Sequence, residues 1–395
     1  MGHSLLSNPA GGYAEGDVRD DGRYALLGSF LGEGGSFLVD VRNPRNPTEV
    51  HRLPSDPDVR NADVKFDTRD GLYYRSQEPN TSDATFTGAE IVDYGFADGT
   101  PEDPAVLASI ESGPTHNLTV HPNAPVLYTV NHDGFDVVDV SDPTNPTVVG
   151  TAGRDADLHD VVIDPESELG HFAYIGGGFG GYVIMDMSDP TAPYEVGHFD
   201  YSGRPSYEEI GLEALKEGTP GFGNCHFATY DPERGIAVVG DEIATGTPGG
   251  KHVFDIGWGD GSPSDPQHVG FTLSPNAAVQ GGDLADIYDW TGHNFSVIPK
   301  GETTLLVSGD YHEGTVVYDV TDPTDPTATD RYRTDDGATE EVNDDPIFDL
   351  GDAPMAWGAD WNERRDVVVT SDFFTGVYVF KVTPAAVPGG GNGGN

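Results

Sequence analysis

The chain has 395 residues, with 67 acidic against 20 basic side chains and a formal net charge of -47 at pH 7. We exclude nucleic acids and anionic membranes as expected partners, because each phosphate contact needs a lysine or arginine. The charge predicts a salt-adapted source, since brine screens the repulsion among surface carboxylates.

A single cysteine, Cys225, leaves no intrachain disulfide. No apolar run reaches the roughly 18 residues of a membrane span. No signal peptide is visible in residues 1–13, which lack its basic and apolar parts.

A short unit recurs along the chain. In each close copy, alternating apolar residues form a strand that ends at Asp or Asn and a Pro-x-x-Pro turn. Close copies occupy residues 37–47, 137–146, 184–193 and 317–326, and divergent copies occupy residues 91–94, 253–256 and 378–382.

Each unit predicts four antiparallel strands. Residues 116–121 and 126–130 are an example of the first two strands, the recurring segment is the third, and residues 147–150 are an example of the fourth. A sandwich would not repeat in this way, and a solenoid repeat is usually shorter. We therefore predict an all-β fold in which residues 14–382 form a single seven-bladed β-propeller of four-stranded antiparallel blades.

These units resemble LVIVD repeats, which are named for the strand and continue into a Ser/Thr-Asp-Pro-x-x-Pro turn. The resemblance covers nearly the whole chain and implies an exported or surface-associated propeller without implying one activity. We accordingly expect an extracellular or cell-surface protein, monomeric, that binds a small molecule or a protein partner.

The ends of the chain and its insertions are less regular. The last unit is one strand short, and residues 3–7 either add this closing strand or form a loose arm within an N-terminal segment of residues 1–13. Loop insertions are expected in blades 4–6, and residues 206–217 predict one short helix. Residues 383–395 have the composition of a flexible Gly/Asn-rich tail.

Four units carry a histidine at the first position of their first strand. These residues are His116, His159, His226 and His293, whereas units two and seven hold Ala62 and Ala359 and unit one holds Glu15 or Gly16. The first strand of a propeller blade lines the central channel, and the loop after the second strand returns to the same face. We therefore expect the histidines to meet the side chains of those loops, namely Asp133, Asp241, Glu242, Asp310 and His312.

Several imidazoles at one depth of a channel suit Fe, Cu or Zn, and nearby carboxylates can be further ligands or can orient the imidazoles. The alternative is that the histidines only hydrogen-bond the neighbouring blades. A metal there would allow a second function, a metal-dependent oxidase, oxygenase or hydrolase. The acidic segments at residues 155–157 and 335–349 are candidate Ca²⁺ sites.

Overall fold

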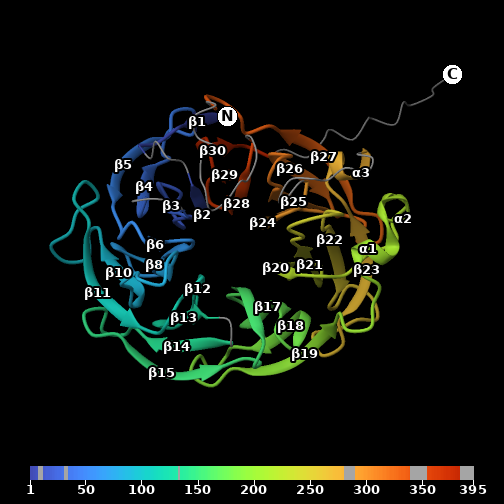
Figure 1. Cartoon of the computed structure of the whole chain (residues 1–395), viewed down its shortest axis with the longest axis horizontal. Helices are drawn as coiled ribbons and strands as arrows, with labels where there is room; N and C mark the ends of the chain where they lie inside the picture. The colour runs from blue at the N-terminus through green and yellow to red at the C-terminus, as the bar shows by residue number, and fades with distance from the viewer. Residues whose placement is uncertain (8–11, 31–33, 132–133, 280–289, 339–353, 383–395) are drawn as a thin grey trace.

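In the computed structural model, seven four-stranded antiparallel sheets are arranged as the blades of a ring around one axis (Figure 1). This confirms the predicted seven-bladed β-propeller. The structure describes residues 1–7, 12–30, 34–131, 134–279, 290–338 and 354–382. The predicted tail, residues 383–395, lies outside this part of the chain. Within it, none of the helices has the length and the apolar composition needed to cross a membrane.

The strands of each blade follow one another from the axis outward. Blade 1 contains β2 (Tyr13–Val18), β3 (Tyr24–Ser29), β4 (Ser36–Asp40) and β5 (Thr48–Leu53); blade 2 contains β7 (Val64–Phe66), β8 (Leu72–Ser76), β10 (Gly88–Asp93) and β11 (Ala105–Glu111); blade 3 contains β12 (Asn117–Val120), β13 (Val126–Val130), β14 (Phe135–Asp139) and β15 (Thr147–Ala152); blade 4 contains β16 (Asp157–Ile163), β17 (Leu169–Gly176), β18 (Phe179–Asp186) and β19 (Tyr194–Asp200).

The remaining blades repeat this order. Blade 5 contains β20 (Cys225–Asp231), β21 (Ile236–Asp241), β22 (Lys251–Asp255) and β23 (Gln267–Thr272); blade 6 contains β24 (Phe295–Lys300), β25 (Thr303–Gly309), β26 (Thr315–Asp319) and β27 (Thr327–Tyr332); blade 7 contains β28 (Ala356–Asn362), β29 (Val367–Asp372), β30 (Gly376–Phe380) and β1 (Gly2–Ser4). A separate pair, β6 (Val59–Arg60) and β9 (Glu78–Pro79), adjoins blade 2.

The outermost strand of blade 7 comes from the other end of the sequence. β1 pairs antiparallel with β30, so that Gly2 lies opposite Val379. The Nε2 atom of His3 lies 2.7 Å from the carbonyl oxygen of Thr375, and the His3 ring stacks on Tyr378 at 4.3 Å. Of the two alternatives for the N-terminal residues, the structure has the closing strand.

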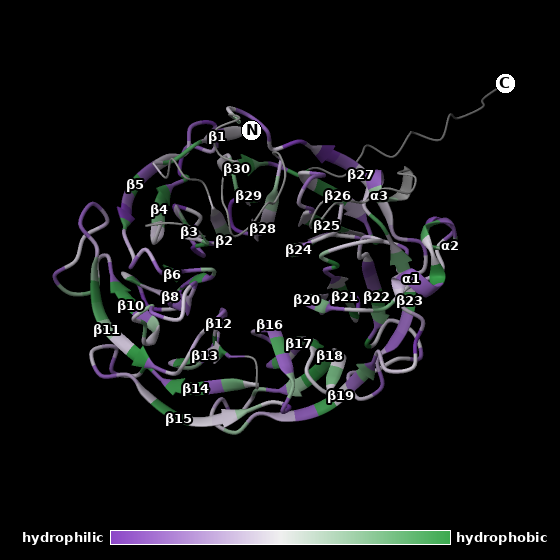
Figure 2. Ribbon diagram, in the orientation of Figure 1, coloured by the Kyte–Doolittle hydropathy of each residue, from purple (hydrophilic) through white to green (hydrophobic). Residues whose placement is uncertain are grey.

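The recurring unit ends its strand through a local hydrogen bond. The Asp139 carboxylate accepts a hydrogen bond from the backbone N–H of Ser141 at 2.9 Å, and Asp186 and Asp319 accept the equivalent bonds in blades 4 and 6. Such bonds fix a turn directly after the strand. Apolar side chains of neighbouring blades pack between the sheets, and the outer strands β5 and β27 are largely hydrophilic (Figure 2).

The insertions carry short helices. The sequence predicts one helix for residues 206–217, and the number of helices is wrong. Gly211 adopts φ 75° and separates two helices, α1 (Tyr207–Ile210) and α2 (Leu212–Lys216). The Ser206 and Glu209 side chains form a capping box at the start of α1. A third helix, α3 (Pro275–Val279), follows blade 5.

We expect Gly2→Val to destabilise the ring at its closure. A Cβ atom at Gly2 would lie 2.2 Å from the carbonyl oxygen of Pro44, so β1 would have to shift away from the β4–β5 turn. The expected loss is about 1–3 kcal/mol of unfolding free energy, measured by chemical denaturation. Ser4→Val in the same strand is the control, and equal stability of the two variants would contradict the role given to this packing.

Candidate metal centre

The four predicted histidines lie at or just before the start of adjacent innermost strands, and at two of them the strand pairing is irregular. The register of β16 shifts at His159 and that of β20 shifts at His226, so each histidine is the extra residue of a β-bulge. A bulge re-aims a side chain relative to the regular alternation of a strand. In β28 the same shift falls on Trp357. Trp357 is therefore the blade 7 residue at this position, and the sequence-based assignment of Ala359 is off by two residues.

The histidine rings form a continuous row across four blades. Ring centroids are 4.8 Å apart for His116 and His159, 3.7 Å for His159 and His226, and 4.4 Å for His226 and His293. A row is not a single coordination sphere, however, because ligands of one ion must all point to one place.

At one end of the row a carboxylate joins two of the imidazoles. The Nε2 atom of His226 lies 3.6 Å from Glu242 Oε2, and the Nε2 atom of His293 lies 3.8 Å from Glu242 Oε1. The ligand atoms of these three residues all lie within 4.8 Å of one another. Among the described residues, no other group of three or more His, Cys, Asp or Glu ligands is this close. The acidic residues 155–157 form no such group, and residues 339–349 of the other candidate Ca²⁺ segment lie outside the described residues.

Each residue of this group, which we call the His-Glu-His group, is held by its own element. Glu242 follows β21 directly, and its backbone N–H donates to the carbonyl of Asn224, just before β20. The Tyr311 hydroxyl, from the loop after β25, donates to the Glu242 carboxylate. Sequence reasoning placed Glu242 at this face but gave Tyr311 no role, since a tyrosine beside three polar neighbours carries no ligand signal of its own.

The hydrogen bonds of His293 determine which of its ring nitrogens is free. Its Nδ1 lies 2.5 Å from the backbone carbonyl of Trp357 in the next blade, so Nδ1 carries the hydrogen and donates. The Nε2 lone pair then faces Glu242. The interblade bond and the ligand role are therefore compatible, because they use different ring nitrogens. Within the described residues, the buried Nδ1 of His226 has no hydrogen-bond partner.

The group is buried, and this sets its charge. Burial lowers the pKa of His226 well below its usual value, and the neighbouring imidazoles of His159 and His293 lower it further. Burial lowers the pKa of His293 to about 3 and raises the pKa of Glu242 to about 7. Both imidazoles are therefore neutral near pH 7, with lone pairs available to a cation that would stabilise the ionised carboxylate.

The other end of the row is engaged differently. The Nδ1 of His116 lies 2.6 Å from Glu78, which also binds Arg60 at 2.6 Å. Glu78 belongs to the β6–β9 pair, which sequence reasoning missed because two-residue strands have no periodicity. The amide of Asn117 donates to the backbone carbonyl of His159 at 2.6 Å. His116 and His159 thus lie beside the His-Glu-His group without joining it.

The remaining predicted residues occupy separate networks. Asp241, at the end of β21, accepts hydrogen bonds from Tyr201 at 3.0 Å and from Tyr207 at 2.9 Å, both in the segment between blades 4 and 5. Asp310 forms a buried ion pair with Lys251 at 2.7 Å. The His312 ring lies 6.3 Å from that of Trp290, and Asp133 lies outside the described residues.

Comparison with known proteins agrees with this architecture. The LVIVD repeat family matches residues 127–152 and 168–201, which contain β13 to β15 and β17 to β19. The chain is an LVIVD-repeat β-propeller. No match is found among curated proteins.

Solved structures share the fold of the LVIVD propeller at low identity. Kuenenia stuttgartiensis hydrazine synthase matches with 12% identity and a TM-score of 0.57 over 96% of this chain and 98% of that chain. The Cps50 (Swd1) β-propeller domain of Myceliophteria thermophila matches with 10% identity and a TM-score of 0.57 over 94% and 97%. A functionally unknown protein from Desulfotomaculum acetoxidans matches with 10% identity and a TM-score of 0.54 over 81% and 84%. Identities this low show the fold alone.

Further along the axis of the LVIVD propeller, carboxylates of one blade accept hydrogen bonds from the backbone of the next. These bonds run from Phe66 N–H to Asp17 at 2.6 Å, from Leu118 N–H to Asp63 at 2.7 Å and from Val18 N–H to Asp360 at 2.8 Å. Glu15, in the same region, accepts a hydrogen bond from the Asn294 amide at 2.7 Å, and burial raises its pKa to about 8.

We expect Glu15→Gln to stabilise the LVIVD propeller in a pH-dependent way. The folded-state pKa of about 8 lies above the ordinary value of 4.5. The free energy of unfolding therefore falls as pH rises from 4.5 to 8, because Glu15 ionises more readily in the unfolded chain than in the folded protein. Gln keeps an acceptor for Asn294 and removes this cost. The two proteins should be equally stable at pH 4, and the variant should gain on the order of 2 kcal/mol at pH 9.

Denaturant unfolding at both pH values measures this difference. Glu233→Gln removes an exposed carboxylate and is the matched control, because it changes the net charge equally without changing a buried group. A gain in the Glu15 variant that is the same at both pH values would contradict the titration of Glu15.

Proposed function

We propose that this LVIVD propeller binds one transition-metal ion through His226, Glu242 and His293. The observation that carries the proposal is the convergence of three buried ligand atoms within 4.8 Å of one another at one position on the axis. Two imidazole nitrogens and a carboxylate oxygen form a donor set that suits Fe, Zn or Cu.

The distances in the group require only small movements to reach coordination geometry. Ligand atoms about 2.0–2.2 Å from one ion are roughly 3.0–3.6 Å from each other. The separations of 3.6 Å and 3.8 Å from Glu242 to the two imidazoles are close to this range. The ligand atoms of the group lie within 4.8 Å of one another. Binding of one ion therefore requires rotation of the Glu242 side chain and an approach of the two imidazole rings by up to roughly 1 Å.

Three protein ligands leave coordination positions open. We propose that the protein is an exported or surface-associated binding protein, in which the metal receives a small molecule or a group of a protein partner. The resemblance to exported propellers supports this location. A monomer fits the closed ring, which leaves no blade incomplete.

A metal-dependent enzyme, either an oxidase or oxygenase or a hydrolase, is the second candidate. The favouring observation is the combination of two histidines and one carboxylate, a donor set that is used by non-haem iron oxygenases with open positions. Tyr311 donates to Glu242 and its ring lies 4.9 Å from that of His293, so a hydroxyl group adjoins the donor set. His159 lies on the other side, next to His226.

Metal content of the purified protein tests the proposal. We expect about one equivalent of Fe, Cu or Zn by elemental analysis in the wild type, and loss of nearly all of it in His293→Ala and in Glu242→Gln. His116→Ala should keep the metal, because His116 is engaged with Glu78 at the far end of the row.

His198→Ala removes an exposed histidine and is the control for non-specific binding. Wild-type protein that stays metal-free after dialysis against each ion and removal of the excess would overturn the proposal. Loss of metal in His116→Ala equal to that in His293→Ala would replace the three-ligand site by a four-histidine site.

A further inference from the structure

A pocket of about 1150 Å³ lies at the end of the axis opposite the histidines. Its lining includes Val18, Phe66, Val120 and Ile163, the last one or two residues of the innermost strands of blades 1 to 4. The histidines lie at the beginnings of such strands. The pocket is therefore separate from the His-Glu-His group, and nothing in the proposed metal binding uses it.

The lining of this pocket is rich in basic side chains. Six of the 20 basic residues of the chain contribute to it, namely Arg19, Arg23, Arg42, Lys65, Arg364 and Arg365. The chain as a whole has 67 acidic residues, whereas the pocket lining has five, namely Asp17, Asp20, Asp21, Asp67 and Asp70. Basic side chains are thus more concentrated here than in the chain as a whole, which favours anions at this place over the rest of so acidic a protein.

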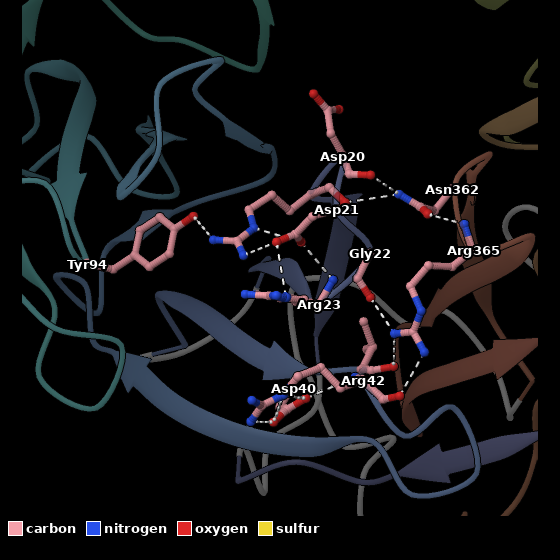
Figure 3. Close-up of polar contacts among 11 residues, drawn as sticks. Asp20, Asp21, Gly22, Arg23, Asp40, Arg42, Tyr94, Asn362 and Arg365 are labelled. Carbon is pink, nitrogen blue, oxygen red and sulfur yellow. Dashed lines mark hydrogen bonds and ion pairs between the residues drawn. The ribbon is translucent and has the colours of Figure 1, made fainter.

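Two of the carboxylates near the arginines, those of Asp21 and Asp40, already pair with arginines (Figure 3). Asp21 accepts hydrogen bonds from Nε and Nη2 of Arg19, with Arg23 3.5 Å away. Asp40 pairs in the same way with Arg42. Two carboxylates therefore pair with three guanidinium groups.

Two further arginines have no carboxylate partner among the described residues. Arg365 donates to the backbone carbonyls of Gly22, Val41 and Arg42 at 2.7 Å, 3.1 Å and 2.7 Å, which joins blade 7 to blade 1 without a direct carboxylate contact (Figure 3). The exposed side chain of Arg364 has no hydrogen bond or ion pair within the described part of the chain. Guanidinium groups bind planar carboxylates and phosphates through paired donors.

The opposite wall of the pocket is apolar. Blades 3 and 4 contribute Val120, Pro122, Val162, Ile163 and Pro165 to the lining. The pocket therefore has a cationic side, built from blades 1 and 7, and an apolar side. A fully polar ion would leave the apolar side without a partner, and an uncharged apolar molecule would leave the arginines without one.

We propose that this pocket binds a small organic anion with an apolar body, whose carboxylate or phosphate head lies against Arg23, Arg364 and Arg365. The apolar body lies against the wall from blades 3 and 4. This places an anion site at one end of the axis and the His-Glu-His group at the other.

Isothermal titration with phenyl phosphate and with 4-phenylbutyrate tests the proposal on the full chain. We expect saturable binding at one site by at least one of the two, and the tighter ligand identifies the head group. Arg23→Gln/Arg364→Gln should weaken this binding by about tenfold or more. Arg365 is left unchanged because it holds blades 1 and 7 together.

Arg45→Gln/Arg333→Gln is the matched control, since it removes two exposed arginine charges outside the pocket lining. It should bind like the wild type, and both double variants should have unchanged unfolding temperatures. Val162→Thr should weaken 4-phenylbutyrate and phenyl phosphate without affecting inorganic phosphate. No saturable binding of either organic anion, or equal weakening by the two double variants, would overturn the proposal.

Discussion

The innermost strand of every blade has one edge that pairs with no other strand of its sheet. The hydrogen bonds made by the backbone groups of that edge determine how the blades meet at the centre of the molecule. An unpaired backbone N–H or C=O group away from water is costly, so an edge strand needs partners. Here the partners come from the neighbouring blade. Asp17 accepts from Phe66, Asp63 accepts from Leu118, and the hydroxyls of Thr119 and Ser296 donate to carbonyls of the next blade. Short polar side chains at the axis therefore join the blades, which explains why an all-β core contains so many buried acids and amides.

The same constraint explains what the sequence could and could not reveal. The repeats predicted seven blades and placed the histidines at one level along the axis. They could do so because the strand, the turn-forming Asp and the two prolines are local features of the sequence. The bulges at His159, His226 and Trp357 are not local, because they depend on the pairing of two strands. Counting along the strand therefore led to Ala359 instead of Trp357. Glu78 and Tyr311 reach the histidine row from a two-residue strand and a loop, and no repeat marks either position.

Burial of this row also decides its chemistry. Burial lowers the pKa values of His226 and His293, which are therefore neutral near pH 7. The buried carboxylates of Glu242 and Glu15 accordingly receive no positive charge from these two imidazoles. The axis meets this need in two ways. Lys65 pairs with Asp63 at 2.5 Å and its pKa is raised because the surrounding carboxylates, including Glu15, outweigh the effect of burial. At Glu242 no lysine is present among the groups that shift its pKa, and a metal ion is the cation that we propose for this position.

The two ends of the axis differ because the innermost strands begin with one kind of residue and end with another. All innermost strands run the same way, so residues at their starts gather at one mouth and residues at their ends gather at the other. Units three to six carry a histidine near this start, so the imidazoles gather at the first mouth. The ends of β2 and β28 lead instead into turns that contain Arg19, Arg23, Arg364 and Arg365, whereas β12 and β16 end in apolar residues and proline. The repeat thus keeps the backbone of the blades similar while their sequences vary. A site with one charged side and one apolar side arises because only some blades carry charged residues at this end of the axis.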